Sequence, residues 1–366
     1  MLRSILLLNR CAHYDVRMWE HFEEMRLPPE AFIDEGVSLW EKLKITEYNI
    51  AAMAKALSSG WIDRELDACE RLGVRIVTFH DADFPPALLK IRAAPMLLYV
   101  KGPMPQICVK TIAVVGTRRC SSYAIKTAKE IGARAAAQGW NVISGGAKGV
   151  DGASHCGSLD AGGVTAAVLG TGIDTVYPPE HRELFERIQE KGALLTEYCI
   201  GSKGERWRFP RRNRIIVGLV SRVVLVEAPY KSGAMITANL AAEEGREVWV
   251  VPGRIDDERC GGSNRLIFDG ATPLIDFDSF FGTEQRYAER TLFDDDTPGQ
   301  DRKNLQSLSG DEKKILSLLS IHGGNTIDNL AGEAKMSAAE VFKIISVMSL
   351  RGLVAMIGPG RYSVCD

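Results

Sequence analysis

Between residues 105 and 280, short apolar runs alternate with longer stretches that have one apolar face. A continuous run such as residues 112–115 is expected of a strand buried on both faces, and residues 122–138 follow it with the pattern of a helix. Short strands that alternate with helices of about ten or more residues indicate a parallel sheet covered by helices on both sides. The pattern therefore predicts an α/β fold built on a doubly wound parallel sheet.

The same pattern sets the expected bounds of each element. Strands are predicted at residues 112–115, 142–143, 164–169, 193–196, 223–226 and 247–251. Helices are predicted at residues 122–138, 151–161, 180–190 and 234–244, with one more that begins at about residue 211 after a loop. Two further short strands, 75–79 and 97–100, precede the alternating region. We place the central domain at residues 81–283.

Different patterns flank this domain on either side. Residues 1–80 show the pattern of short helices, which predicts a small helical N-terminal domain. Residues 307–366 contain three helix-like stretches and two short strands around a Gly-Pro-Gly turn, the outline of a winged helix. Six acidic residues fall between 284 and 301 with few apolar ones, so residues 284–306 are predicted to be an acidic linker.

Composition excludes several classes of protein. Apolar residues make up 45% of the 366 residues and charged residues 25%, so the chain as a whole is neither disordered nor fibrous. The longest apolar runs are far too short to cross a bilayer, and no secretory leader follows Met1, so we expect a cytoplasmic protein with no membrane contact. The eight cysteines are scattered without a Cys-x-x-Cys pair, which argues against structural zinc and favours reduced thiols.

The charge balance changes when it is counted by segment. The whole chain carries 45 basic and 47 acidic residues, a net charge of −2 that argues against a nucleic-acid partner. Residues 101–280, however, hold 23 basic and 20 acidic residues, whereas residues 1–100 hold 12 and 15, and residues 281–366 hold 10 and 12. Six cations and one acid fall within residues 203–214 alone. The near-neutral total thus conceals one local concentration of positive charge.

The basic segment 203–214 also contains the aromatic residues Trp207 and Phe209. Cations that follow the phosphates, together with aromatic faces on which bases stack, are the features of a single-strand-binding surface. A run of charge is often only a solvated face, but one with embedded aromatic residues is less often so. The segment therefore favours a single-stranded nucleic acid as the partner.

Three more segments occupy the place where open α/β sheets bind ligands, beyond the carboxyl ends of their strands. The first is Gly116-Thr117-Arg118-Arg119, where an arginine can form two hydrogen bonds with a phosphate. The second is residues 144–153, where three glycines and a serine precede a helix, so that amide N–H groups can face an anion. In the third, Ser232 and Gly233 precede another helix. Each segment can also be an ordinary turn or a plain helix cap.

Signs of catalysis are absent from these segments. The glycine turn matches neither G-x-G-x-x-G nor the G-x-x-x-x-G-K-[ST] of a phosphate-binding loop, so nucleotide hydrolysis has no support. The six histidines are dispersed, and no nucleophile–base set or pair of carboxylates is evident. The sequence predicts no catalytic residue, no cofactor and no metal.

In this order, the segments resemble the DNA-processing protein A family (DprA, also called Smf). The resemblance covers about residues 84–275 and rests on several long motifs in fixed order. These motifs include Gly116-Thr117-Arg118, Ser144-Gly145-Gly146-Ala147-Lys148-Gly149-Val150-Asp151, Tyr177-Pro178-Pro179-Glu180-His181, Phe209-Pro210-Arg211-Arg212-Asn213-Arg214 and Val251-Pro252-Gly253.

The resemblance implies an extended Rossmann-like domain that binds single-stranded DNA without cutting it. It also implies a homodimer that acts in natural transformation, protects incoming DNA and helps to load the RecA recombinase past single-strand-binding protein. A sterile-alpha-motif-like N-terminal domain and a winged-helix C-terminal domain fit the predicted bounds. The site residues expected from the segments and the resemblance are Arg118, Ser144, Gly145, Gly146, Lys148, Gly149, Phe209, Arg211, Arg212, Asn213, Arg214, Ser232 and Gly233, with Trp207 as a stacking residue suggested by the basic segment alone.

Two other functions remain open on the sequence. A nucleotide-processing enzyme of the lysine-decarboxylase-like phosphoribohydrolase group would share a related fold, but such enzymes show a Pro-Gly-Gly-x-Gly-Thr segment that the turn at Ser144 lacks. A scaffold that binds only protein partners would not bind DNA at low salt. The C-terminal domain carries six acids and six bases between residues 311 and 366, so we expect it to contact protein rather than DNA.

Overall fold

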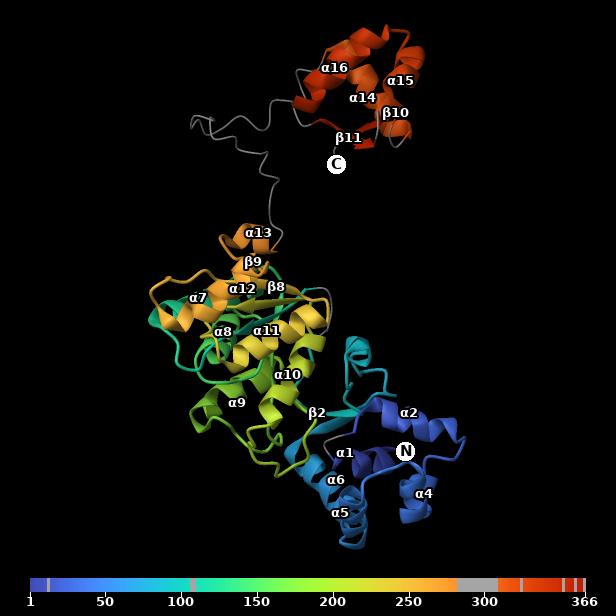
Figure 1. Ribbon diagram of the computed structural model, residues 1–366, viewed down its shortest axis with the longest axis vertical. Coiled ribbons are helices and arrows are strands. Elements are labelled where there is room, and N and C mark those ends of the chain that lie inside the picture. The colour runs from blue at the N-terminus through green and yellow to red at the C-terminus, as the bar shows by residue number, and fades with distance from the viewer. Residues whose placement is uncertain are drawn as a thin grey trace. The chain divides into compact units, whose positions relative to one another are not determined.

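The computed structural model of the protein describes residues 1–11, 14–105, 110–281, 309–322, 325–350, 353–358 and 361–364. The chain divides into two compact units, residues 1–283 and 284–366. The first unit holds a large sheet with its helices, and the second holds a small set of helices with its own sheet (Figure 1). Among the described residues, every helix is too short or too polar to span a bilayer. The predicted acidic linker, residues 284–306, lies outside the described residues.

A nine-stranded sheet forms the centre of the first unit, in the order β1-β2-β6-β5-β4-β3-β7-β8-β9. The strands are β1 (Arg75–Thr78), β2 (Leu97–Lys101), β3 (Thr111–Val115), β4 (Asn141–Ser144), β5 (Thr165–Val168), β6 (Ala193–Thr196), β7 (Arg222–Leu225), β8 (Glu247–Val250) and β9 (Thr272–Pro273). From β6 to β9 all neighbouring strands run parallel, which confirms the predicted parallel sheet. The sequence does not predict the antiparallel addition of β2 to β6 and of β1 to β2.

Helices cover both faces of this sheet. They are α7 (Ser122–Ala137), α8 (Val150–Asp160), α9 (Arg182–Lys191), α10 (Arg208–Gly218), α11 (Gly233–Glu243), α12 (Gly261–Phe268) and α13 (Phe277–Phe281), with short 3-10 helices at Pro86–Lys90, Pro179–His181 and Glu258–Cys260. Ile112 and Val114 of β3 share an apolar cluster with α7 and α13, whereas Ala113 and Val115 share another with α10 and α11. Because side chains alternate along a strand, this division shows helices on both sides and confirms the α/β fold.

The main departure from the predicted bounds concerns α10, which begins at Arg208 rather than near residue 211. Most of the arginines in the basic segment 203–214 therefore lie on a helix and not in a loop. Pro210 does not prevent this, because a proline in the first turn removes only an N–H group that has no partner within the helix. The side chains of this segment consequently point to different sides of α10.

The N-terminal helices pack against the sheet rather than apart from it. They are α1 (Leu2–Asn9), α2 (Val16–Glu24), α3 (Ala31–Asp34), α4 (Val37–Lys42), α5 (Glu47–Ser58) and α6 (Trp61–Leu72). They gather near the β2 end of the sheet (Figure 1), and Ile5 and Leu8 of α1 belong to the same apolar cluster as β2 and β6. The predicted boundary between residues 80 and 81 falls between two paired strands, β1 and β2.

The second unit has its own core. Its elements are α14 (Gly310–His322), α15 (Ile327–Ala334), α16 (Ala338–Leu350), β10 (Asn325–Thr326), β11 (Val354–Gly358) and β12 (Arg361–Val364). The strands pair antiparallel in the order β10-β12-β11. Each helix contributes a buried residue to one apolar cluster, for example Ile315, Leu330 and Val341. The elements follow the predicted order, and the winged-helix assignment stays a prediction.

His155 is an ionisable residue buried in the core of the first unit. It lies on α8, and its side chain is fully buried. The Thr165 hydroxyl donates to Val142 O at 2.7 Å, so His155 Nδ1, 2.6 Å from the same hydroxyl oxygen, donates its own proton to it. Burial lowers the pKa of His155 to about 3. The imidazole is therefore neutral in the folded protein at neutral pH.

Acid should destabilise the first unit through this histidine. The unfolded chain binds a proton at His155 near the ordinary pKa of 6.5, and the folded chain only near 3, so stability that is present above pH 6.5 is lost as the pH falls toward 3. From pH 7 to pH 5 we expect this group to lower the free energy of unfolding by about 2 kcal/mol. In His155→Gln, the free energy of unfolding measured in urea should change with pH by about 2 kcal/mol less than in the wild type over the same range. The exposed His21→Gln is the control and should behave like the wild type. Equal pH dependence in the wild type and His155→Gln would contradict a buried neutral imidazole.

Candidate nucleic-acid interface

A cavity of about 740 Å³ opens at the carboxyl ends of β3, β4 and β7. β3 pairs with β4 on one side and with β7 on the other, so the strand order reverses at β3. Open α/β sheets bind their ligands at such a reversal. The predicted site residues that line the cavity are Arg118, Phe209, Arg212, Asn213, Ser232 and Gly233.

The turn after β3 presents Arg118 to this cavity. Glu227 O accepts a hydrogen bond from Thr117 N at 2.7 Å, and the Glu227 carboxylate accepts from Ser121 N at 3.0 Å and from Ser121 Oγ at 2.5 Å. Ser121 also caps α7 by accepting from Ala124 N at 3.1 Å. Both ends of the turn are thereby attached to Glu227. Between them, Arg118 is exposed and forms no ion pair with another described residue.

The glycine turn after β4 is held from within by Asp151. Asp151 Oδ2 accepts hydrogen bonds from Gly145 N at 3.1 Å and from Ala147 N at 3.4 Å. The Ser144 hydroxyl donates to a backbone carbonyl of β3 at 2.7 Å. The sequence predicts that this turn offers its N–H groups to an anion, but two of them serve the turn itself.

The other two glycines of the turn have a conformational role. Gly146 and Gly149 have φ values of +62° and +83°, which favour glycine. A Cβ atom at Gly149 would lie 2.6 Å from Thr117 O, so the absence of a side chain lets the two turns approach each other. Neither glycine lines the cavity. Among the described residues of this turn, a ligand in the two cavities would therefore meet Gly145, Ala147 and Lys148.

Arg212 reaches from α10 to the glycine turn. Its Nη1 donates to Gly145 O at 2.8 Å and also to Val168 O. Its Nε lies 3.2 Å from Asn213 Oδ1 and donates to it. Only 4% of Arg212 is exposed. This arginine thus connects α10 to the ends of β4 and β5 and presents a small part of its surface to the cavity.

The positive charges of Arg118 and Arg212 favour an anionic ligand. Burial lowers the pKa of Arg212 to about 10; the negative charge of Asp151 opposes this change, and the positive charge of Arg118 adds to it. Burial raises the pKa of Asp151, and the charge of Arg212 acts against that rise. Two guanidinium groups therefore repel each other across the cavity beside one desolvated carboxyl group. An anion between them would relieve that repulsion.

Phe209 and Tyr177 form an aromatic wall of the cavity. Their ring centroids lie 5.4 Å apart with the planes inclined by 39°, and the Arg118 guanidinium carbon lies 5.3 Å from the centroid of the Phe209 ring, within cation–π range. A Cβ atom at Gly170 would lie 2.7 Å from Phe209 Cδ1, so the ring rests on this glycine. A second cavity of about 250 Å³ adjoins the same residues and Lys148. An aromatic face next to a cation suits a nucleotide.

The N-terminus of α11 borders the cavity from another side. Ser232 Oγ accepts from Met235 N at 3.4 Å and caps the helix. Asn213 Nδ2 donates to Thr237 Oγ1 at 2.8 Å, which connects α10 to α11. No atom lies within 4 Å of a Cβ placed on Gly233, so this glycine leaves the helix end open. The positive end of the helix dipole adds to the charge of the arginines.

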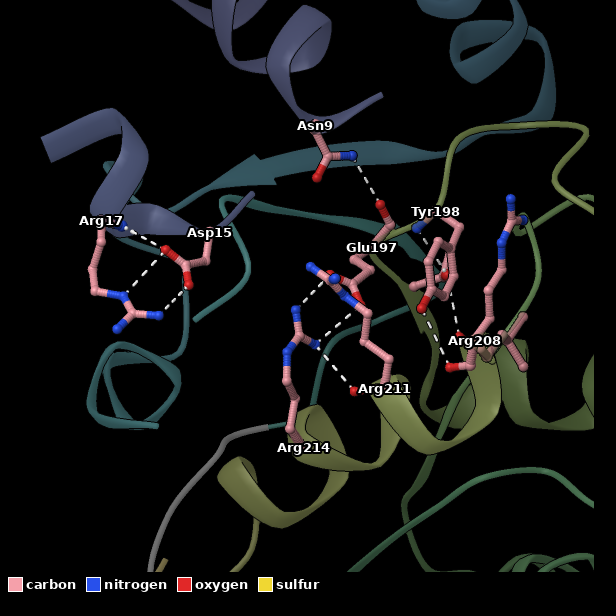
Figure 2. Close-up of polar contacts among 10 residues, drawn as sticks. Asn9, Asp15, Arg17, Glu197, Tyr198, Arg208, Arg211 and Arg214 are labelled. Carbon is pink, nitrogen blue, oxygen red and sulfur yellow. Dashed lines mark hydrogen bonds and ion pairs between the residues drawn. The ribbon is translucent and has the colours of Figure 1, made fainter. Parts of the chain in front are cut away.

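Two predicted DNA contacts, Arg211 and Arg214, do not line either cavity. Arg214 Nη1 and Nη2 donate to Glu197 Oε1 and Oε2 at 3.0 Å and 2.6 Å (Figure 2). Arg214 and Glu197 are both buried. Arg211 Nε lies 3.9 Å from the same carboxylate. Both arginines face the one carboxylate of Glu197 and not a cavity, so the structure does not place them where the sequence predicts a phosphate contact.

Trp207 and Lys148 also have partners within the protein. Trp207 lies edge-on to Tyr198 with ring centroids 6.2 Å apart, and its Nε1 donates to Glu205 Oε2 at 2.5 Å. It lies outside the lining of both cavities, so it is not on the same wall as Phe209. Lys148 forms an ion pair with Glu180 beside the smaller cavity. This pair is exposed and therefore weak, so a phosphate can replace the carboxylate.

Known proteins share the region that builds these cavities. The model of the family described as DNA recombination-mediator protein A matches residues 75–284, more than half of the chain. The chain belongs to the DNA recombination-mediator protein A family. The resemblance noted from the motifs is thereby confirmed.

Individual members of the family show how much of the chain is shared. The putative DNA processing protein DprA of Mycobacterium tuberculosis is 34% identical over 322 residues, which cover 83% of this chain and 81% of that protein. Protein Smf of Synechocystis is 38% identical over 214 residues, which cover 57% of this chain and 54% of that protein. The match with Smf thus spans about half of that relative's length.

Two solved structures of DprA proteins have a similar fold. DprA of Streptococcus pneumoniae superimposes with a TM-score of 0.64 and 29% identity, over 78% of this chain and 96% of that one. DprA of Helicobacter pylori, whose structure was described for its single-stranded DNA binding mode, gives a TM-score of 0.53 and 26% identity, over 57% of this chain and 95% of that one.

The sequence does not identify the carboxylates that organise the two turns beside the cavity. Asp151 stands at the start of α8 and has the pattern of a simple helix cap, and Glu227 has no local feature that indicates a partner. A usable signal for Asp151 was its place directly after a glycine turn, where a carboxylate can accept the amides of the turn. Tyr177 belongs to one of the family motifs, but nothing in the sequence indicates that its ring lies beside Phe209.

Gly145→Ala tests the packing beneath the glycine turn. A Cβ atom there would lie 2.6 Å from Arg212 Nη2 and 2.7 Å from Asp151 Oδ2, so these buried groups would have to move. We expect the free energy of unfolding, measured in urea, to fall by about 1–3 kcal/mol. Gly233→Ala, which has open space at its Cβ position, is the matched control and should unfold like the wild type. Wild-type stability in Gly145→Ala would mean that the turn is not packed as described.

Proposed function

We propose that the protein binds single-stranded DNA in the cavity at the ends of β3, β4 and β7 and acts as a non-enzymatic recombination mediator. The observation that carries the proposal is the Arg118 guanidinium, which lies 5.3 Å from the centroid of the Phe209 ring in the lining of the cavity. An unmatched cation beside an aromatic face offers both contacts that a flexible single strand needs. The single-stranded DNA binding described for the Helicobacter pylori relative supports the same ligand.

In this proposal the phosphates lie against Arg118 and Arg206, near the N-terminus of α11, while a base stacks on Phe209. Arg206 lines the cavity, is exposed and forms no ion pair with another described residue. Arg212 stays bound to the glycine turn and holds the site together rather than moving onto the DNA. Bases in a duplex are already paired and stacked on both faces, so we expect the cavity to prefer single strands.

We also propose that the cavity has no catalytic role. Among the described residues that line the cavity, Tyr177 and Asp151 are the ionisable ones that are not cationic. Asp151 Oδ2 accepts two backbone amides, so the carboxylate serves to hold the glycine turn. A phosphoribohydrolase would release free base from nucleoside monophosphates. We expect no release, and release at a catalytic rate would favour the enzyme instead.

Arg118→Ala should weaken binding of a single-stranded oligonucleotide and reduce its salt dependence. Each phosphate contact on a single strand contributes about −0.7 to the slope of log K against log[salt], so the slope should become less steep by about that amount. Fluorescence anisotropy at several salt concentrations measures it. Lys110→Ala removes the same charge just before β3, at the opposite end of that strand, and should keep the wild-type slope. A wild-type slope in Arg118→Ala would place the DNA elsewhere.

Phe209→Leu in the same assay separates stacking from charge. Leucine keeps an apolar side chain on Gly170 but offers no ring for a base, and stacking contributes about 1–3 kcal/mol per base. Affinity should therefore fall about 5- to 150-fold while the salt slope stays that of the wild type. Trp207→Leu, outside the cavity lining, is the control and should bind nearly as well as the wild type. A larger loss in Trp207→Leu would move the stacking site to that residue.

We further propose that a cytoplasmic homodimer passes the strand to the RecA recombinase, past single-strand-binding protein, during natural transformation. Membership of the recombination-mediator family supports this step. RecA assembly on an oligonucleotide coated with single-strand-binding protein, followed by RecA ATP hydrolysis, should start earlier when the wild-type protein is added. Arg118→Ala should have no such effect. An unchanged delay with a protein that binds DNA would limit the function to binding and protection.

A further inference from the structure

α10 concentrates positive charge in a way that opposes helix formation. Four of its 11 residues are arginines and none is acidic. Like charges three or four positions apart face each other and destabilise a helix, and cations in the first turn oppose the helix dipole. The N-terminus of α10 also lacks a side-chain cap. Carboxylates that other elements supply therefore stabilise the helix.

Glu197, directly after β6, supplies the carboxylate for two of these arginines. It accepts both terminal nitrogens of Arg214, at 3.0 Å and 2.6 Å, and lies 3.9 Å from Arg211 Nε. The next residue, Tyr198, holds the first turn of α10, because its hydroxyl donates to Arg208 O at 3.3 Å and the Arg208 guanidinium carbon lies 4.9 Å from its ring centroid. Figure 2 shows both residues beside the helix that carries the three arginines.

The N-terminal helices hold the segment that contains Glu197. Asn9 Nδ2, at the end of α1, donates to Glu197 O at 2.8 Å (Figure 2), and this contact is buried. Glu65 Oε1 of α6 accepts Ile200 N at 2.8 Å. The same oxygen accepts the Tyr99 hydroxyl of β2 at 2.8 Å. The four residues after β6 are thus attached to two helices that do not line the DNA cavity.

The two sides of α10 differ in what they contact. Phe209, Arg212 and Asn213 line the cavity, and Arg211 and Arg214 do not. A shift of the helix on its Glu197 side would displace the Phe209 ring from its place beside Arg118. The contacts of Glu197 therefore help to determine the positions of the side chains of α10 that line the cavity.

We propose that Glu197 is a positioning residue for DNA binding, which fixes the cavity side of α10 through Arg211 and Arg214. The inference rests on the proposed single-stranded DNA binding and deepens it. The N-terminal helices take part in the same way, because Asn9 holds the backbone of Glu197. They thus contribute to DNA affinity without contacting the DNA.

Glu197→Gln removes the charge and keeps the shape of the side chain. If Glu197 positions α10, the variant should bind single-stranded DNA about 10-fold more weakly, the loss expected from an impaired stacking contact. The salt slope should stay that of the wild type, because Arg118 and Arg206 still meet the phosphates. A 2-aminopurine base in the oligonucleotide, which loses fluorescence when it stacks, should be quenched less. Glu197→Asp, which keeps the charge, should recover part of the affinity.

The opposite result would come from arginines that contact DNA directly. In that case Glu197→Gln would release Arg211 and Arg214 toward the phosphates, so binding would become tighter and the salt slope steeper. That outcome overturns the positioning role. Wild-type affinity and quenching in a folded Glu197→Gln overturn it as well.

Asn9→Ala removes the hydrogen bond to Glu197 O but keeps the ion pair between Glu197 and Arg214. It therefore tests the inference even if Glu197→Gln does not fold. It should weaken DNA binding about threefold with an unchanged salt slope, which corresponds to the loss of part of one neutral hydrogen bond. Ser4→Ala is the matched control, since Ser4 is buried on the same helix and its hydroxyl donates to Pro29 O at 2.7 Å, away from Glu197. An equal loss of affinity in Ser4→Ala would reduce the effect to general destabilisation and overturn the coupling.

The assay also separates this inference from the proposed function. A wild-type protein that binds no single-stranded DNA overturns the proposed function itself. Binding that depends on Arg118 and Phe209, but not on Glu197 or Asn9, overturns only the positioning role. Urea denaturation of each variant first shows that it is folded under the conditions of the binding assay.

Discussion

The packing of α10 beside the cavity depends on how the charges of its arginines are compensated. A charged group taken out of water costs several kcal/mol unless a counter-charge and hydrogen bonds replace its hydration. Asp151, Glu197 and Glu205 act on arginines of this one helix, and they come from the start of α8, the end of β6 and the loop before α10. All three elements thus contribute to the position in which α10 packs.

This matching divides the positive charge near the cavity into two groups. The arginines of α10 have partners inside the protein, although Arg212 also borders the cavity, whereas Arg118 and Arg206 line the cavity and form no ion pair with another described residue. Charge counted along the sequence cannot separate the two groups. The six cations of residues 203–214 therefore overstate what DNA would meet there, and the net charge of −2 understates what the cavity offers.

Sequence patterns predicted what is local in this fold. β6 lies at its predicted bounds, and α8 and α11 lie within one residue of theirs. These bounds were predictable because buried positions recur at a regular spacing along the sequence and are occupied by apolar residues. Contacts between distant residues, such as that of Arg214 with Glu197, were not predictable, since nothing near either residue indicates the other. The same gap explains the start of α10: local charge favours a loop, and remote carboxylates allow a helix from Arg208 onward. Arg118 and Phe209 line one cavity, and the sequence placed them together through the family motifs, whereas their role in binding stays a prediction.

The position of β2 limits where the chain can be truncated or fused to another protein. β2 lies between β1 and β6, so both of its edges are hydrogen-bonded. A gene fusion that joined a foreign N-terminal segment at residue 81 would discard β1 and leave one edge of β2 open. An open edge is a template for strands of other molecules, and the side chains of β2 that β1 and the N-terminal helices bury would be uncovered with it. The helical N-terminal part is therefore not an interchangeable cassette, because β1, the edge strand of the intact sheet, and the N-terminal helices together cover β2.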